Sequence, residues 1–166
     1  MNNWPLQRDC AVFYGNPDPK GDGVPDRAWE DANLVWIKPR WKMVLAWDTA
    51  REVKRIRIHK HCAPSLERVL DAIARQYAAR EQIEHHRLHL FGGAYHFRLM
   101  RGSTRLSMHA YGCAIDLDPE HNPLGRRWRM GMMSKSVVEA FAREGWTWGG
   151  TWKRPDAQHF QAARVA

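Results

Sequence analysis

The sequence predicts a single α+β domain in which helices pack on a small antiparallel sheet. The chain has 166 residues, which is the length of one ordinary domain. Short apolar runs of strand length are interspersed with two stretches in which apolar residues recur at helical spacing. Because the sequence contains no internal repeat and no low-complexity linker, we expect residues 1–166 to form one domain.

The first part of the chain predicts an irregular segment followed by strands. Within the irregular segment 1–33, residues up to about Asp26 are rich in Pro, Gly, Asn and Asp, which favour turns, and a short helix is expected around 25–33. We expect this segment to pack on the rest of the domain. The apolar runs 34–37 and 43–47 predict strands or extended packing segments, and the alternating run 53–59 predicts a strand.

Two helices are predicted from the spacing of apolar residues. The first runs from Pro64, a residue suited to a first helical turn, to about Arg80. Its apolar residues fall on one stripe, which consists of Leu66, Val69, Leu70, Ile73 and Tyr77. The second covers residues 135–143, where Ser134 can cap the start and Gly145 can close the end. We expect the first helix to form the main hydrophobic layer.

The remaining strands lie close to polar residues that can carry chemistry. Residues 91–95 predict a turn into a strand that carries Arg98. Residues 113–118 alternate as a half-buried strand, in which Asp116 falls on the face opposite Cys113. The loop and the strands that follow are predicted at 119–131, 146–152 and 159–161.

An imidazole and a carboxylate, His109 and Asp116, lie on either side of a glycine turn. A metal site built from them needs a third ligand, which His159 offers far downstream. Two imidazoles and one carboxylate are a familiar catalytic zinc set that leaves a fourth position open for water. Asp156, three residues before His159, can lie close to that water and act as general base toward it and general acid toward a departing amine. This division of roles is typical of peptide-bond hydrolysis.

Three motifs together resemble a known family. They are Ser-x-His-x-x-Gly-x-Ala-x-Asp at 107–116, Trp-Gly-Gly-x-Trp at 148–152 and Asp-x-x-His-Phe at 156–160. The combination resembles the zinc peptidases that include the D-alanyl-D-alanine carboxypeptidases and dipeptidases and the L-alanyl-D-glutamate endopeptidases of bacteriophage endolysins. The resemblance extends over residues 34–165. It implies a fold shared with the hedgehog signalling domain, with a zinc cleft on the open face of the sheet.

The resemblance implies roles for individual residues. His109, Asp116 and His159 would be the zinc ligands, and Asp156 would be the catalytic acid and base. Some relatives have Glu at the position of Asp156, so the shorter Asp side chain favours the endolysin-like branch. The family also holds a substrate carbonyl or carboxylate with an arginine that stabilises the oxyanion. Arg98 is the first candidate for this role and Arg101 the second. Fewer residues separate Arg98 from His109 in the sequence than in many relatives.

Further candidates remain open between a functional and a structural role. Ser107 could bind substrate beside the metal or could only close the turn. Of the three tryptophans Trp146, Trp148 and Trp152, one is expected to face the cleft, and Trp148 is assigned to substrate binding. Cys113 is a weaker candidate for a thiolate ligand, because its alternation places it toward the core. A second metal cluster could be formed by His85, His86 and His89, although these residues fit a solvated segment better.

These features predict a zinc-dependent peptidase that hydrolyses a peptide bond in the stem peptides of bacterial peptidoglycan, as a phage or prophage endolysin. L-Ala-D-Glu endopeptidase, D-Ala-D-Ala carboxypeptidase and cross-bridge-cleaving activities all remain open, because specificity lies in loops that the sequence does not place. Two alternatives belong to other classes. One is a non-catalytic, zinc-containing module that binds the cell wall, and the other is a nucleic-acid binder that depends on basic charge.

Charge and composition bear on the partners. The chain carries 26 Lys and Arg against 18 Asp and Glu, a net charge of +8 that suits the anionic bacterial envelope. No recognisable nucleic-acid motif, secretory signal or apolar run long enough to enter a membrane occurs in the sequence, and its 3 cysteines show no CxxC spacing. We expect a monomer that is made in the host cytoplasm and reaches the wall after release.

Overall fold

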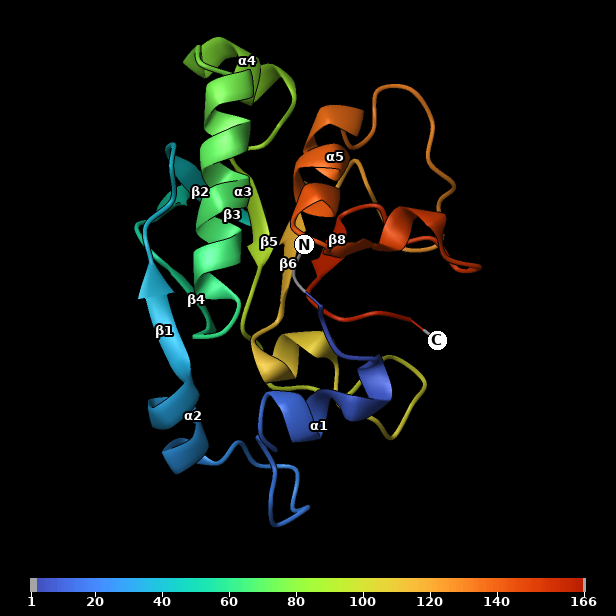
Figure 1. The fold of residues 1–166 in the computed structure, drawn as a ribbon. Helices are drawn as coiled ribbons and strands as arrows, with labels where there is room; N and C mark the ends of the chain where they lie inside the picture. The colour runs from blue at the N-terminus through green and yellow to red at the C-terminus, as the bar shows by residue number, and fades with distance from the viewer. Residues whose placement is uncertain (1–2, 166) are drawn as a thin grey trace.

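The computed structural model describes residues 3–165 and has the expected α+β architecture, with helices packed on a small, largely antiparallel sheet (Figure 1). The larger sheet has six strands in the order β3-β2-β5-β6-β8-β7, and β1 and β4 form a separate pair. The strands are β1 (Leu34–Ile37), β2 (Met43–Leu45), β3 (Asp48–Val53), β4 (Ile56–His59), β5 (Leu90–Gly93), β6 (Ala114–Leu117), β7 (Thr147–Trp148) and β8 (His159–Gln161). The helices are η1 (Gln7–Asp9), α1 (Cys10–Phe13), α2 (Arg27–Asn33), α3 (Ala63–Gln76), α4 (Arg80–His85), η2 (Met108–Tyr111), α5 (Lys135–Arg143) and η3 (Gly149–Thr151).

Pairing in the larger sheet brings distant parts of the chain together. All its pairs are antiparallel except β2 with β5, which run parallel. Strand β6 lies between β5 and β8, and its register with β8 places Asp116 directly opposite His159. The sheet therefore sets side by side two residues that are far apart in the sequence.

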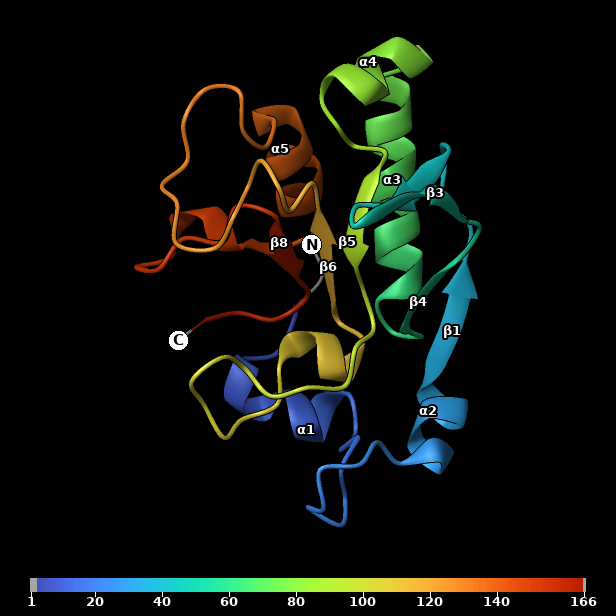
Figure 2. The same cartoon turned by 180° about the vertical axis from the view of Figure 1, so that it is seen from behind.

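Helices α3 and α5 pack on each other and cover one face of the larger sheet. This face is toward the viewer in Figure 1, and Figure 2 shows the sheet from the other side. The predicted apolar stripe of α3 is buried, from Leu66 through Ile73. In α5, the ring of Phe141 stacks on Phe160 of β8 with a centroid distance of 4.0 Å. Over residues 3–165, every helix is too short or too polar to span a bilayer.

Two sequence expectations about strands are wrong. The run 53–59 is not one strand, because β3 ends at Val53 and β4 begins at Ile56 in the other sheet. This break lets Val53, Ile56 and Ile58 all point into the core, which a single straight strand could not do. Likewise, β5 ends at Gly93, so Arg98 lies in an extended segment beyond the strand.

The N-terminal segment packs against the last strand. Leu6 and Arg164 form a parallel bridge, and the backbone N–H of Gln7 donates to the carbonyl of Arg164 at 2.9 Å. Cys10 and Tyr14 of this segment are buried, and the Tyr14 hydroxyl donates to the carbonyl of Ala162 at 2.6 Å. The segment therefore contributes side chains to the core.

Candidate metal centre

Three side chains from three elements converge on one point. His109 lies in η2, Asp116 in β6 and His159 in β8. His109 Nε2 is 3.2 Å from Asp116 Oδ2, and His159 Nδ1 is 2.8 Å from Asp116 Oδ1. One donor atom from each residue lies within 4.8 Å of the others, and the two imidazoles are buried. The structure thus brings together the three residues predicted as zinc ligands, in a cluster that could hold a metal ion.

The local sequence explains how η2 presents His109. Ser107 precedes this short helix, and its hydroxyl accepts a hydrogen bond from the backbone N–H of His109 at 3.3 Å. Gly112 ends the helix in the left-handed conformation with φ of 65°. A Cβ atom there would lie 2.7 Å from Leu34 Cδ2 and 3.0 Å from the backbone nitrogen of His59. Only glycine fits, and it allows the chain to turn from His109 directly into β6.

Hydrogen bonds on the outer sides of the two rings orient their lone pairs. His109 Nδ1 lies 2.6 Å from the carbonyl oxygen of Ala94, and His159 Nε2 lies 3.0 Å from Gln161 Oε1. With both oxygens accepting, the protonated nitrogens of the neutral rings face outward, an assignment that follows from the hydrogen-bond network. His109 Nε2 and His159 Nδ1 then carry lone pairs directed inward.

The inner face of this cluster is electron-rich. The two inward nitrogens are 3.2 Å apart, and the carboxylate of Asp116 lies against both. Two lone pairs and a carboxylate repel one another at these distances unless a cation lies between them. The donor set of two imidazole nitrogens and one carboxylate therefore fits a divalent metal of the zinc type.

The electrostatics of the residues agree with this fit. Burial raises the pKa of Asp116, but interactions with His109 and His159 outweigh it and hold that pKa below its usual value. Burial lowers the pKa of His159, but its contacts with Asp116 outweigh burial and raise it. Asp116 is thus kept ionised, which is the form that binds a cation.

Asp156 lies beside this cluster with an unused oxygen. Its Oδ1 is buried and has no hydrogen-bond partner among the described residues. Burial, with the nearby charge of Asp116, raises its pKa above the usual value despite the opposing effect of His159. Its backbone is fixed, because its N–H donates to the carbonyl of Gly149 at 2.8 Å. A Cβ on Gly149 would lie 2.6 Å from the Asp156 carbonyl oxygen, so the Trp-Gly-Gly motif permits this approach.

The metal cluster and Asp156 share the wall of one pocket of about 390 Å³. The exposed side chains of Arg98 and Arg101 also line it, as does the buried Ser107. Residues 101–162 match a family model described as D-alanyl-D-alanine carboxypeptidase. Searches of curated proteins and of solved structures found no match.

The stretch that matches the D-alanyl-D-alanine carboxypeptidase model contains all three candidate ligands and Asp156. The match supports a peptidase that acts on a peptidoglycan-like substrate. Arg98 lies just outside the matched stretch, whereas Arg101 is its first residue. The family match therefore supports a peptidase, and the cluster within the matched stretch could hold a metal ion.

The structure places the remaining candidates as follows. Within the described chain, Trp152 lines the pocket and Trp148 does not, because the Trp148 indole donates to the carbonyl of Ala157 at 2.9 Å and packs on the core. Cys113 points into the core, and its thiol donates to the carbonyl of Met108 at 3.3 Å. None of His85, His86 and His89 lines this pocket, and His85 and His86 line a separate one.

Sequence reasoning did not identify several residues of the site. Gln161 holds the ring of His159 and is itself 3.3 Å from the side-chain nitrogen of Gln7. Its position two residues after His159, on the same side of a strand, was a usable signal. The sequence gives no such signal for the carbonyl of Ala94, because every residue has a backbone carbonyl. Arg154 also lines the pocket, two residues before Asp156.

Proposed function

We propose that the protein is a zinc-dependent peptidase that hydrolyses a peptide bond in bacterial peptidoglycan stem peptides, as an endolysin of the L-Ala-D-Glu endopeptidase or D-Ala-D-Ala carboxypeptidase type. One observation carries the proposal. The inward lone pairs of His109 and His159, the Asp116 carboxylate and the unpartnered oxygen of Asp156 all meet in one pocket. A structural metal site would enclose its ion with protein ligands and would not need a carboxylate with an unpartnered oxygen beside it.

The ligands proposed for zinc are His109 Nε2, His159 Nδ1 and the carboxylate of Asp116. When bound, zinc would supply Lewis acidity that polarises a carbonyl and lowers the pKa of water at its open position. Ala94 and Gln161 keep each ring in the tautomer and orientation that binding needs. In such metal sites, outer hydrogen bonds of this kind contribute to affinity as well as to geometry.

Asp156 is proposed to move the proton. Its free Oδ1 accepts a proton from the attacking water and then delivers it to the departing amine nitrogen. A raised pKa suits both steps, because a carboxylate with a higher pKa is a stronger base at neutral pH. The fixed backbone at Gly149 holds this carboxylate in place between the two steps.

The arginines on the pocket wall are proposed to bind the substrate. Arg98 and Arg101 carry donors that can hold a carboxylate or the oxyanion that develops on the carbonyl oxygen. Ser107 lines the same pocket, but its hydroxyl already accepts from the His109 N–H, which supports a role in closing the turn. In place of Trp148, Trp152 is proposed as the aromatic contact for substrate.

The proposed setting is the bacterial envelope. The net charge of +8 favours association with an anionic wall, and this attraction weakens as salt is added. We propose that the protein is made in the host cytoplasm, acts as a monomer and reaches the wall when a separate agent permeabilises the membrane.

Incubation of the zinc-loaded protein with purified peptidoglycan, followed by mass spectrometry of the released fragments, tests the proposal. We expect new amino and carboxyl termini at one bond of the stem peptide, and their masses identify the bond. Asp156→Ala should retain zinc and release nothing. Unchanged peptidoglycan would refute hydrolysis. Binding to the wall without fragments would instead indicate a non-catalytic module.

A further inference from the structure

More basic than acidic side chains line the pocket. Arg98, Arg101 and Arg154 line it, whereas its acidic side chains are Asp116 and Asp156. Within residues 3–165, none of these three arginines forms an ion pair with an acidic side chain. A divalent ion at the cluster would increase the excess. Cations placed this close together repel each other, and a substrate with several negative groups relieves that repulsion.

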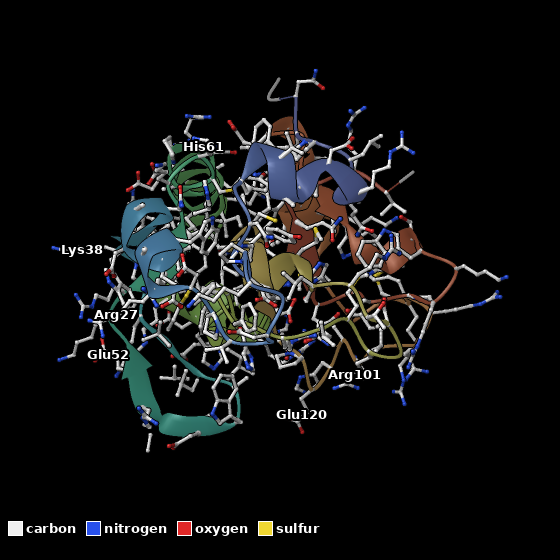
Figure 3. The ribbon with its side chains drawn as sticks, turned by 90° about the horizontal axis from the view of Figure 1, so that it is seen from below. Arg27, Lys38, Glu52, His61, Arg101 and Glu120 are labelled. Atoms are coloured by element: carbon white, nitrogen blue, oxygen red, sulfur yellow. The ribbon has the colours of Figure 1, made fainter. Side chains whose placement is uncertain are left out.

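The three arginines come from two separate segments. Arg98 and Arg101 belong to the long connection between β5 and η2, and Arg154 belongs to the turn between η3 and β8. In Figure 2 both connections, drawn in yellow and in red, project to the same side of β6 and β8. Figure 3 labels Arg101, whose side chain extends outward at the edge of the molecule. The pocket therefore has two independent sources of guanidinium groups.

The backbone at Arg154 is anchored through the two residues that follow it. The carbonyl of Pro155 accepts from the N–H of Gly125 at 2.6 Å, and the N–H of Asp156 donates to Gly149. Pro155 itself restricts the backbone conformation of the residue before it. Its neighbour Lys153 is also exposed but does not line the pocket. Arg154 is thus a cation held at the pocket wall, and Lys153 is a matched cation directed elsewhere.

We infer that Arg154 binds a second carboxylate of the substrate, distinct from the group held by Arg98 and Arg101. The substrate is then a peptide with a free carboxylate near the hydrolysed bond in addition to the group that Arg98 and Arg101 hold, and a carboxamide at that position is a poor replacement. A guanidinium donates two parallel hydrogen bonds to a carboxylate, which a neutral amide accepts much less well. This inference rests on the proposed function, because it assigns a ligand to the same pocket.

Two peptides that differ in one group test it. They share a stem-peptide sequence of L-Ala, γ-linked D-Glu and a diamino acid, and the α-carboxyl of the D-Glu is either free or amidated. Asp156→Ala, loaded with zinc, allows their Kd to be measured by calorimetry without hydrolysis. We expect the free acid to bind roughly tenfold more tightly than the amide, as for one charge-assisted hydrogen-bonded pair. Arg154→Gln added to this variant should remove the preference, and Lys153→Gln should leave it intact.

The outcomes separate the two proposals. If zinc-loaded wild-type protein hydrolyses peptidoglycan but the two peptides bind equally well, the second-carboxylate inference is wrong and the proposed function stands. A preference that survives Arg154→Gln also overturns the inference, because another residue then reads the carboxylate. If wild-type protein leaves peptidoglycan intact and neither peptide binds, the proposed function itself fails.

Discussion

His59 and the pair His109 and His159 are buried alike, but only the pair is arranged to bind a metal. His59 Nε2 donates to the carbonyl of Tyr14 at 3.0 Å, and its Nδ1 accepts from the backbone N–H of His61 at 3.1 Å. Both of its ring nitrogens are used by the backbone. Burial lowers its pKa to about 4, which keeps the ring neutral. His59 is therefore a structural side chain.

The pair differs in how its nitrogens are used. In each ring, one nitrogen forms a hydrogen bond with an outer oxygen, of Ala94 or of Gln161, and the other nitrogen faces Asp116. Burial of an imidazole is thus a poor indicator of function. The informative quantity is the number of lone pairs left over, and whether they meet a carboxylate at a common point.

The largest expected effect is the loss of zinc binding on substitution of a proposed ligand histidine, compared with substitution of the structural histidine His59. His159→Ala should abolish zinc binding and hydrolysis, because two remaining ligands hold zinc weakly. His59→Ala should keep the zinc content of wild type while lowering the free energy of unfolding by about 2 to 3 kcal/mol, since its packing and hydrogen bonds are lost. Metal analysis of the dialysed protein measures the zinc content, and urea denaturation measures the free energy of unfolding. Full zinc retention in His159→Ala would contradict the ligand assignment.

Asp118, which is buried, and Asp156, which is half-buried with a buried Oδ1, allow the same comparison for acids. Asp118 is fully engaged, with Arg87 at 2.8 Å and His121 at 2.7 Å, whereas Asp156 Oδ1 is unpartnered. Asp156→Asn should reduce kcat by roughly 10²- to 10⁴-fold with zinc retained. Asp118→Asn should lower stability but leave kcat of the folded protein near wild type. Steady-state kinetics and thermal denaturation test this pair, and equal kcat in wild type and Asp156→Asn would remove Asp156 from the mechanism.

A smaller effect is expected from Gln161, which orients His159. Gln161→Leu removes the acceptor for His159 Nε2 and should weaken zinc binding about 10- to 100-fold. Gln161→Glu keeps an acceptor oxygen at the same position and is the matched control. Competition with a chelator of known affinity gives Kd for both variants. Wild-type affinity in Gln161→Leu would show that the ring is held by packing alone.

The smallest effect is a displaced pH profile. Asp156 must be ionised to accept a proton, so kcat/KM falls as the pH falls through its pKa. Because burial and the charge of Asp116 raise that pKa, the midpoint of the acid limb should lie above the ordinary value of about 4. Zinc content measured at each pH separates this titration from loss of metal. A midpoint at or below the ordinary value, with zinc retained, contradicts the assignment.

The parts of the fold with a clear apolar period could be predicted from the sequence. The helix over 135–143 and the strand over 34–37 match α5 and β1 at their bounds. By contrast, α4 has Ile83 as its one buried residue among polar ones, so no apolar stripe signals it. Its presence also explains why α3 ends at Gln76, before the predicted end at Arg80. Local spacing does not show where tertiary contacts break one pattern into two.

The candidate site divides in the same way. His109, Asp116 and His159 could be identified because side-chain chemistry and motif spacing mark them, and β6 and β8 bring two of them into register. The carbonyl of Ala94 could not, since its role depends only on where the backbone passes. Arg154 carries no such mark in the sequence, because exposed arginines are common, and only its place on the pocket wall distinguishes it from Lys153.

The hydrogen bond from His109 to Ala94 limits whether this metal centre can be transferred to another protein scaffold. Ala94 lies outside the stretch 101–162, just after β5, and β5 is held in place by β2 and β6. A transplant of that stretch onto another scaffold would carry every proposed ligand but leave the His109 ring free to rotate about its own bonds. An engineer who wishes to graft the chemistry must therefore move the neighbouring strand as well.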